Sequence, residues 1–239
     1  MTVQIQNSPA PGLTCAGKAQ CTDCEIRKMA MCSGLSGHEL DPLLHGVDII
    51  QVEPQSHVYR EGGQAGHVFT VRSGVVKLTK ELPNGDVRIV RLSTRGDTIG
   101  LEVMLGGAYH HTAVALTEVE LCRVPLGVMH ALNEQVPSFH HQLMARWQMN
   151  VDAAESFITD LSTGHAKARL AHLLLNYFSD GLSGVWNHPA RDDIAHMLGV
   201  TLETASRIMA EFKRAGLISE AAGRVVIRDP VALKAIAED

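Results

Sequence analysis

The chain has 239 residues, of which 45% are apolar and 20% charged, and its net charge is −5. This is an ordinary soluble composition, and the length allows one large or two small domains. No apolar run reaches the roughly 18 residues of a membrane span, and no basic segment followed by an apolar stretch marks a secretory signal. We therefore expect a cytoplasmic protein that has no membrane partner.

The charge is unevenly distributed along the chain. Residues 1–164 carry 12 basic and 17 acidic residues, whereas residues 165–229 carry 8 basic and 7 acidic residues. The acidity therefore belongs to the N-terminal part. Because the C-terminal part is only weakly basic, its affinity for DNA would depend on a few well-placed residues and on the symmetry of a dimer.

The N-terminal half is predicted to be rich in β-structure. Residues 1–20 are rich in Pro, Gly and small residues and have no periodicity, so we expect a flexible N-terminus there. From about residue 47, short alternating runs are separated by turns, and Asn84-Gly85 between two of them is a strong hairpin signal. Such regular short strands predict a barrel or jelly roll. We therefore take residues 21–136 as a cysteine-bearing segment followed by a β-roll.

A long helix is predicted over residues 137–163. Six of its residues recur at alternating spacings of four and three, which is the pattern of a coiled-coil seam. A second apolar stripe, formed by Met144, Val151 and Ile158, runs beside this seam. One stripe can pack on the β domain while the other meets a partner helix; the alternative is a core helix with both stripes buried in one chain. The length and the two apolar sides favour a homodimer. The predicted dimer contacts are Leu143, Trp147, Asn150, Ala154, Phe157 and Leu161.

The C-terminal part, residues 164–239, contains the most specific pattern of the chain. Residues 191–210 suit two short helices that pack at a tight angle. Gly199 stands where the chain must turn and a positive φ costs little, and Thr201 is a natural N-cap for the second helix. Residues 216–230 predict a β-hairpin wing. The segment is therefore expected to be a winged helix-turn-helix.

The second of these helices carries three polar residues on one face. Glu203, Ser206 and Arg207 stand at positions i, i+3 and i+4, outside the apolar stripe. Arg can bind guanine through O6 and N7, Glu can accept from cytosine N4, and basic residues at the helix end suit phosphates. A solvated charged face is the alternative reading. The predicted contacts to double-stranded DNA are Thr201, Glu203, Ser206, Arg207, Lys213 and Arg214.

Four of the five cysteines fall within the first 32 residues. Cys21 and Cys24 form a CxxC pair, Cys32 follows, and Cys122 lies inside an apolar run. In a reducing compartment such clustering favours a metal site over disulfides. The spacing does not choose between zinc and an iron–sulfur cluster, and a site without metal is also open. Cys15 is left over and is expected to be a free thiol. The predicted ligands are Cys21, Cys24, Cys32 and Cys122.

Catalysis is not expected. The chain contains no nucleophile elbow, no P-loop, no GxGxxG after a strand and no HExxH.

Together these features resemble the FNR branch of the CRP/FNR family of bacterial regulators. The resemblance covers nearly the whole chain from Cys21 onward, including YREGGQAGHVFTVRSGVVKL, GDTIG, ELCRVP and LGVTLETASRIMAEFKRAGLI. Its most specific part, residues 203–207, is similar to the E-x-x-S-R signature by which FNR-type proteins read TTGAT half-sites. The resemblance implies an α+β fold with a cyclic-nucleotide-binding-like β-roll, a long dimerisation helix and a C-terminal winged helix-turn-helix.

The resemblance also implies a function. It indicates an activator that responds to oxygen through a [4Fe–4S] cluster on the four predicted cysteines, binds palindromic DNA as a homodimer and contacts RNA polymerase. The C-x₂-C-x₇-C spacing departs from the shorter spacing of the best-known member. A structural zinc, or a haem or NO-sensing site, is the alternative. Cyclic-nucleotide receptors of the family present an Arg to the phosphate, and residues 109–112 contain none.

Overall fold

The computed structural model describes residues 12–19, 21, 24–36, 46–177, 185–187, 190–221 and 224–238. The chain divides into two compact units, which are described separately below. The first comprises residues 1–78 and 93–150, and the second comprises residues 79–92 and 151–239. This division falls inside the long helix, whereas the domain limits expected after residues 136 and 163 stay a prediction. None of the helices in the described ranges is both long and apolar enough to cross a membrane.

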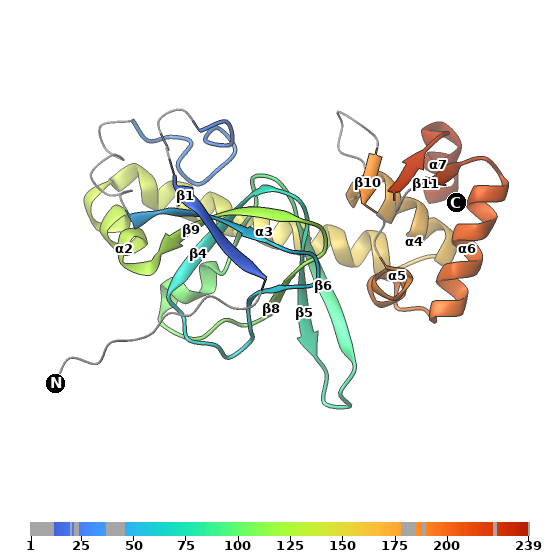
Figure 1. The fold of residues 1–239 in the computed structure, drawn as a ribbon, viewed down its shortest axis with the longest axis horizontal. Helices are drawn as coiled ribbons and strands as arrows, with labels where there is room; N and C mark the ends of the chain where they lie inside the picture. Colours follow the sequence, from blue (N-terminus) through green and yellow to red (C-terminus); the bar gives the residue numbers. More distant parts are fainter. Residues whose placement is uncertain are drawn as a thin grey trace. The chain divides into compact units, whose positions relative to one another are not determined.

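The β-roll contains two antiparallel sheets (Figure 1). The first has the strand order β1 (Leu13–Lys18), β2 (Asp48–Val52), β9 (Val119–Pro125), β4 (His67–Ser73) and β7 (Thr98–Ile99). The second has the order β3 (His57–Tyr59), β8 (Thr112–Ala115), β5 (Val76–Glu81) and β6 (Val87–Ser93). The short 3₁₀ helix η2 (Leu101–Leu105) and helix α2 (Leu126–Gln135) complete this part. The predicted α+β class with an N-terminal β-roll is confirmed.

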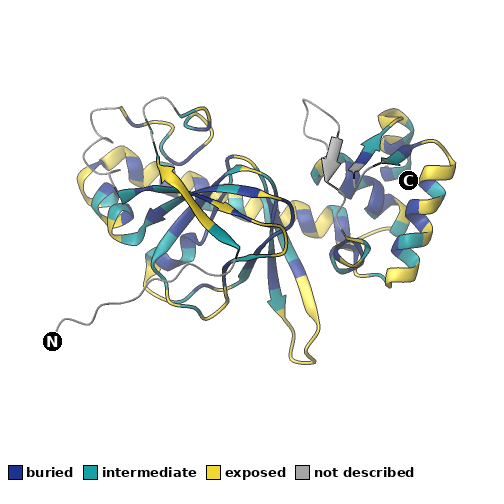
Figure 2. Ribbon diagram, viewed as in Figure 1, coloured by how far each residue is buried: buried dark blue, intermediate teal, exposed yellow. Residues whose placement is uncertain are grey.

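Strand β1 corrects the expectation of a flexible N-terminus. It pairs antiparallel with β2 from Leu13, opposite Val52, to Lys18, opposite Asp48. Five of its six residues are exposed, as the colours in Figure 2 show, so its side chains follow no buried–exposed alternation. Its backbone hydrogen bonds to the edge of the sheet stabilise it instead. Residues 1–11 and 20 lie outside the described residues.

Strand β9 lies at the centre of the first sheet, and this determines the position of Cys122. In the register, Cys122 stands opposite Ile49 of β2 on one side and Thr70 of β4 on the other. Its neighbours Val119 and Leu121 are fully buried. Cys122 is therefore a fixed point of the β-roll core.

Helix α3 (Pro137–Ser162) confirms the predicted long helix, while the dimer contacts assigned to its seam stay a prediction. Leu143, Phe157 and Leu161 are buried within the single chain. The Asn150 side-chain amide donates to the Thr98 carbonyl at 3.2 Å. Part of the predicted seam thus packs within the chain itself, because the apolar face of a helix packs on the nearest apolar surface. Trp147, Asn150 and Ala154 of the same seam remain partly exposed.

The second stripe of α3 is the exposed one. Met144, Val151 and Ile158 are 48%, 41% and 59% exposed. They stand seven residues apart, so they share one side of the helix. This stripe is an apolar surface that α3 presents to solvent.

The second unit is a winged helix-turn-helix (Figure 1). Helix α4 (Ala166–His172) continues directly into the short π-helix η3 (Leu173–Tyr177). Three helices follow: α5 (Arg191–Leu198), α6 (Leu202–Arg214) and α7 (Pro230–Ala237). Strands β11 (Ile218–Ala221) and β12 (Arg224–Ile227) form the predicted wing hairpin, and β10 (Val185–Asn187) pairs with β12.

The turn between α5 and α6 has the predicted geometry. Gly199 ends α5 in the left-handed conformation with φ = 61°, and the Val200 backbone N–H donates to the Ala195 carbonyl at 3.1 Å. The Thr201 hydroxyl caps α6 by accepting from the Thr204 backbone N–H at 3.2 Å. These local interactions set the angle at which α6 leaves the turn.

Replacing Gly199 with Ala is expected to destabilise the second unit by roughly 1–2 kcal/mol, because a Cβ is strained in the left-handed region. Thermal unfolding followed by circular dichroism measures the loss. Gly127→Ala is the matched control, because Gly127 lies in α2 with open space around its Cβ position and no positive φ. That substitution should leave stability unchanged or raise it slightly. Identical melting of the two variants would contradict the expectation.

Candidate functional site

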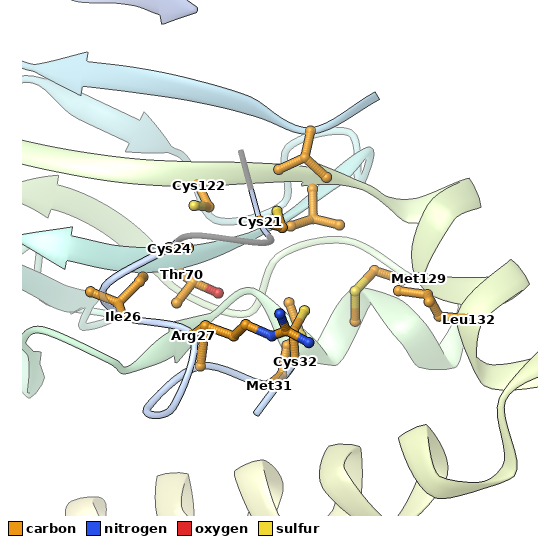
Figure 3. Close-up of a pocket in the computed structure, with 13 residues that line it drawn as sticks. Cys21, Cys24, Ile26, Arg27, Met31, Cys32, Thr70, Cys122, Met129 and Leu132 are labelled. Atoms are coloured by element: carbon orange, nitrogen blue, oxygen red, sulfur yellow. The ribbon is translucent and has the colours of Figure 1, made fainter. Parts of the chain in front are cut away.

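The four predicted cysteine ligands line one cavity in the first unit (Figure 3). The cavity is small, with a volume of about 40 Å³. The other lining residues are mostly apolar: Ile26, Arg27, Ala30, Met31, Val47, Thr70, Val124, Met129 and Leu132. Cys15 is exposed on β1 and is not among the residues that line the cavity. Of the five cysteines, the fold therefore gathers the four that the sequence singles out.

The cysteine segment, residues 24–36, reaches the cavity through consecutive turns. The Arg27 backbone N–H donates to the Cys24 carbonyl at 3.0 Å, and the Leu35 N–H donates to the Cys32 carbonyl at 3.3 Å. Ile26 and Met31 between them are almost completely buried. These apolar side chains fix the segment against the β-roll, so that Cys24 and Cys32 line the same cavity as Cys122.

The cysteine segment also packs directly on α3. Arg146, only 9% exposed, donates through Nη2 to the Ala30 carbonyl at 2.9 Å. One turn earlier on the helix, the Gln142 side-chain oxygen accepts from the Ser33 hydroxyl at 3.2 Å. Burial lowers the pKa of Arg146. The sequence analysis did not single out these two α3 residues, which connect the cysteine segment to the helix.

Arg72 on β4 contacts two of the four cysteines. Its Nη1 donates to Cys24 Sγ at 3.2 Å and to Cys122 Sγ at 3.7 Å. Its Nε donates to the Glu120 carboxylate in an ion pair. The sequence analysis missed Arg72 because it lies inside an ordinary strand pattern, and no local signal marks its contact with the cysteines.

The thiols of Cys21, Cys32 and Cys122 have raised pKa values. Burial, reinforced by the neighbouring cysteines, raises the pKa of Cys21 to about 11 and that of Cys32 to about 12. Burial also raises the pKa of Cys122, and Arg72 acts in the opposite direction. Four sulfur atoms in an apolar cavity therefore need added positive charge to become thiolates together. Soft, positively charged iron or zinc centres are the groups that such a donor set suits.

The described residues contain no group of three or more His, Cys, Asp or Glu side chains already arranged to hold a metal ion. Four cysteines nevertheless line one cavity. Their donor chemistry fits an iron–sulfur cluster.

The predicted DNA-reading face of α6 is available to a ligand. Glu203 and Arg207 are exposed and Ser206 is half-buried, as the exposure along α6 in Figure 2 illustrates. The opposite face packs in the unit through Ala205, Ile208, Met209 and Phe212, which are buried. At the helix end, Lys213 forms an ion pair with Glu220 at 3.4 Å, and Arg214 donates to the Ala210 carbonyl at 3.4 Å.

Comparison with known proteins identifies both domains. Residues 49–135 match the cyclic nucleotide-binding domain, and residues 168–236 match the Crp-like helix-turn-helix domain. The transcriptional activator protein anr of Pseudomonas aeruginosa is 28% identical over 230 residues, covering 92% of this chain and 93% of that protein. The fumarate and nitrate reduction regulatory protein of Salmonella typhi is 26% identical over 224 residues, covering 91% and 90%.

The solved structure of FixK2 from Bradyrhizobium japonicum matches with a TM-score of 0.70 at 24% identity. The match covers 80% of this chain and 96% of FixK2, and it shows that the fold is shared. The chain contains the two matched domains in this order, and it aligns with transcription regulators over about nine-tenths of its length. Both findings agree with the expectation of a DNA-binding regulator rather than an enzyme. The chain belongs to the CRP/FNR family of bacterial transcription regulators.

Proposed function

We propose that this chain is an oxygen-responsive regulator whose iron–sulfur cluster promotes the DNA-binding dimer at low oxygen. The observation that carries the proposal is the convergence of Cys21, Cys24, Cys32 and Cys122 on one cavity. The relatives include an anaerobic regulatory protein of Pasteurella multocida, 26% identical, which supports oxygen as the signal. Regulation would take place in the cytoplasm, with RNA polymerase as a further partner.

A [4Fe–4S] cluster is the cofactor that this site suits best. Four cysteine thiolates are also the ligand set of a structural zinc ion, so the family resemblance and the anaerobic relatives favour the cluster, and the size of the cavity does not decide between them. When bound, the cluster would supply iron–thiolate bonds that oxygen can break, and with them the positive charge that the buried thiols need. The four cysteines would bind it, and the apolar lining would limit the access of water.

Nucleotide binding is not favoured, although the roll matches the cyclic nucleotide-binding domain. Glu102 accepts from the His110 backbone N–H at 3.2 Å and lies 4.0 Å from His111 Nδ1. Residues 109–112 of this stretch provide no Arg for a cyclic phosphate. A phosphate there would lack the guanidinium that neutralises it elsewhere in the family.

The contacts between the cysteine segment and α3 support a mechanism by which cluster binding influences dimer formation. Arg146 and Gln142 tie α3 to residues 30 and 33, directly beside Cys32. A cluster bound by Cys21, Cys24 and Cys32 on one side and by Cys122 of the β-roll on the other would hold the segment in place. It would thereby keep these contacts and the position of α3. Ligand binding to one state of an equilibrium shifts the population towards that state, so loss of the cluster would favour the monomer.

We propose that the dimer forms through the exposed stripe of α3, Met144, Val151 and Ile158. A dimer would place two α6 helices about 34 Å apart, as successive major grooves on one side of DNA require. Glu203, Ser206 and Arg207 would read base edges of a TTGAT-type palindrome. Lys213 and Arg214 would contact phosphates, while Thr201 positions the helix through its cap.

Replacing Ile158 with Glu is expected to shift the cluster-loaded protein from dimer to monomer at micromolar concentration, because a carboxylate would be buried without a partner. Analytical ultracentrifugation without air measures the shift. Ser156→Glu adds the same charge to an exposed position of α3 outside the stripe and should leave the dimer intact. An unchanged dimer in the Ile158 variant would show that another surface forms the interface.

The proposed function is tested by measuring iron and acid-labile sulfide on protein purified without air. We expect about four of each per chain, with a broad visible absorption that bleaches as air is admitted. Zinc in a colourless protein would contradict the oxygen switch and leave the DNA-binding function in place.

A further inference from the structure

We propose that Arg72 is a positioning residue for the iron–sulfur cluster: it donates hydrogen bonds to two ligand sulfurs and raises the reduction potential of the cluster. This inference rests on the proposed function, because it concerns the same cavity. The residues that carry it are Arg72, Cys24, Cys122 and Glu120, all within the first unit.

A β-bulge directs Arg72 towards two of the cysteines. The pairing of β4 with β9 is regular up to Val71, opposite Leu121, and its register shifts before Ser73, opposite Glu120. Arg72 is the extra residue at that shift. A bulge redirects the side chain of the residue it adds, and here that side chain reaches Cys122 on the neighbouring strand.

The guanidinium bridges two chain segments that are far apart in sequence. Nη1 contacts Cys24 of the cysteine segment and Cys122 of the sheet, while Nε donates to Glu120. Arg presents several donors in one rigid plane, so the ion pair with Glu120 fixes the direction of the donors towards sulfur. Groups that orient metal ligands in this way tune both the affinity and the redox properties of a site.

The sign of the effect follows from charge. A reduced cluster carries one more negative charge than the oxidised one, so N–H donors to its thiolates stabilise the reduced form more and raise the midpoint potential. Glu120 offsets part of the positive charge of Arg72. Removing Arg72 should therefore lower the potential, and neutralising Glu120 should raise it.

The experiment is a dithionite titration of the full-length, cluster-loaded protein without air, in which each cluster accepts one electron from the reductant. The variants are Arg72→Gln, Arg72→Lys and Arg123→Gln. Arg123 is the matched control, because it is adjacent to Cys122 but forms its ion pair with Asp48 at 2.7 Å. We expect a lower midpoint potential for Arg72→Gln, an intermediate value for Arg72→Lys and a smaller shift for Arg123→Gln. Resonance Raman bands of the iron–thiolate bonds should move only in the Arg72 variants.

An Arg72→Gln protein whose potential and Raman bands match those of Arg123→Gln would overturn the inference. If Arg72→Gln fails to retain the cluster, the potential of Glu120→Gln tests the inference instead. This variant keeps the N–H donors of Arg72 and removes the negative charge that opposes them. A raised potential in that variant supports the inference, and an unchanged one overturns it. A wild-type protein that binds no cluster refutes the proposed function itself, so the two failures are distinguishable.

Discussion

Protein carrying Cys122→Ser is expected to lose both its iron and its specific DNA binding in the absence of air. Cys122 is the proposed ligand that lies in the sheet between β2 and β4, and a hydroxyl would replace its thiolate poorly. Without the link between the cysteine segment and the β-roll, the dimer would dissociate and each monomer would bind one half-site. Because two linked sites bind about 10²–10⁴-fold more tightly than one, we expect at least a roughly 100-fold loss of affinity. Fluorescence anisotropy with a labelled palindromic duplex measures it.

Cys15→Ser is the control for this experiment. Cys15 is an exposed cysteine on β1 and is not one of the cavity-lining residues, so its replacement should change neither iron content nor DNA affinity. Circular dichroism should show that the helices of the second unit persist in both variants. Undiminished DNA binding by Cys122→Ser would refute the switch.

Replacing Arg207 with Ala is expected to cost roughly 1–3 kcal/mol at the cognate site, a loss of about 5- to 150-fold, and little on random DNA. Arg207 is exposed on α6, whereas the next residue, Ile208, is buried in the unit. The substitution would therefore remove the proposed base contact without disturbing the core. Competition binding with specific and random duplexes at one fixed salt concentration separates the two affinities.

Arg214→Ala provides the comparison for Arg207. Arg214 lies in the last turn of α6, where we assign it to phosphate, so its loss should weaken specific and random binding to a similar degree. Equal losses on both kinds of DNA for Arg207→Ala would show that this residue also touches only the backbone.

The helix-turn-helix could be predicted almost residue by residue because its determinants are local. The positive φ of Gly199 and the cap of Thr201 depend on neighbours only a few residues away. The same holds for the wing hairpin. The gathering of the four cysteines was anticipated from their clustering and from the family resemblance, and the fold places them around one cavity.

Features that depend on distant contacts were missed or misassigned. On α3 both apolar stripes fit the heptad pattern, and only the packing of Leu143 and Phe157 shows that part of the seam is buried in the chain. Strand β1 is stabilised by its sheet neighbour rather than by its own side-chain pattern. The contacts of Arg72 and Arg146 arise from a bulge and from a loop that packs on a helix, and neither arrangement leaves a signal in a single sequence.

The four cysteines differ in the kind of structure that holds them, and this affects how the proposed cluster would be inserted. Cys122 belongs to a sheet whose strands pair by backbone hydrogen bonds, whereas Cys24 and Cys32 lie on a segment built from turns. The β-roll can therefore fold before any iron arrives, unlike small zinc domains that fold only around their metal. Iron and sulfide would bind to a β-roll that is already folded. One polypeptide could then lose its cluster, be reloaded without refolding, and report changes in oxygen repeatedly during its lifetime.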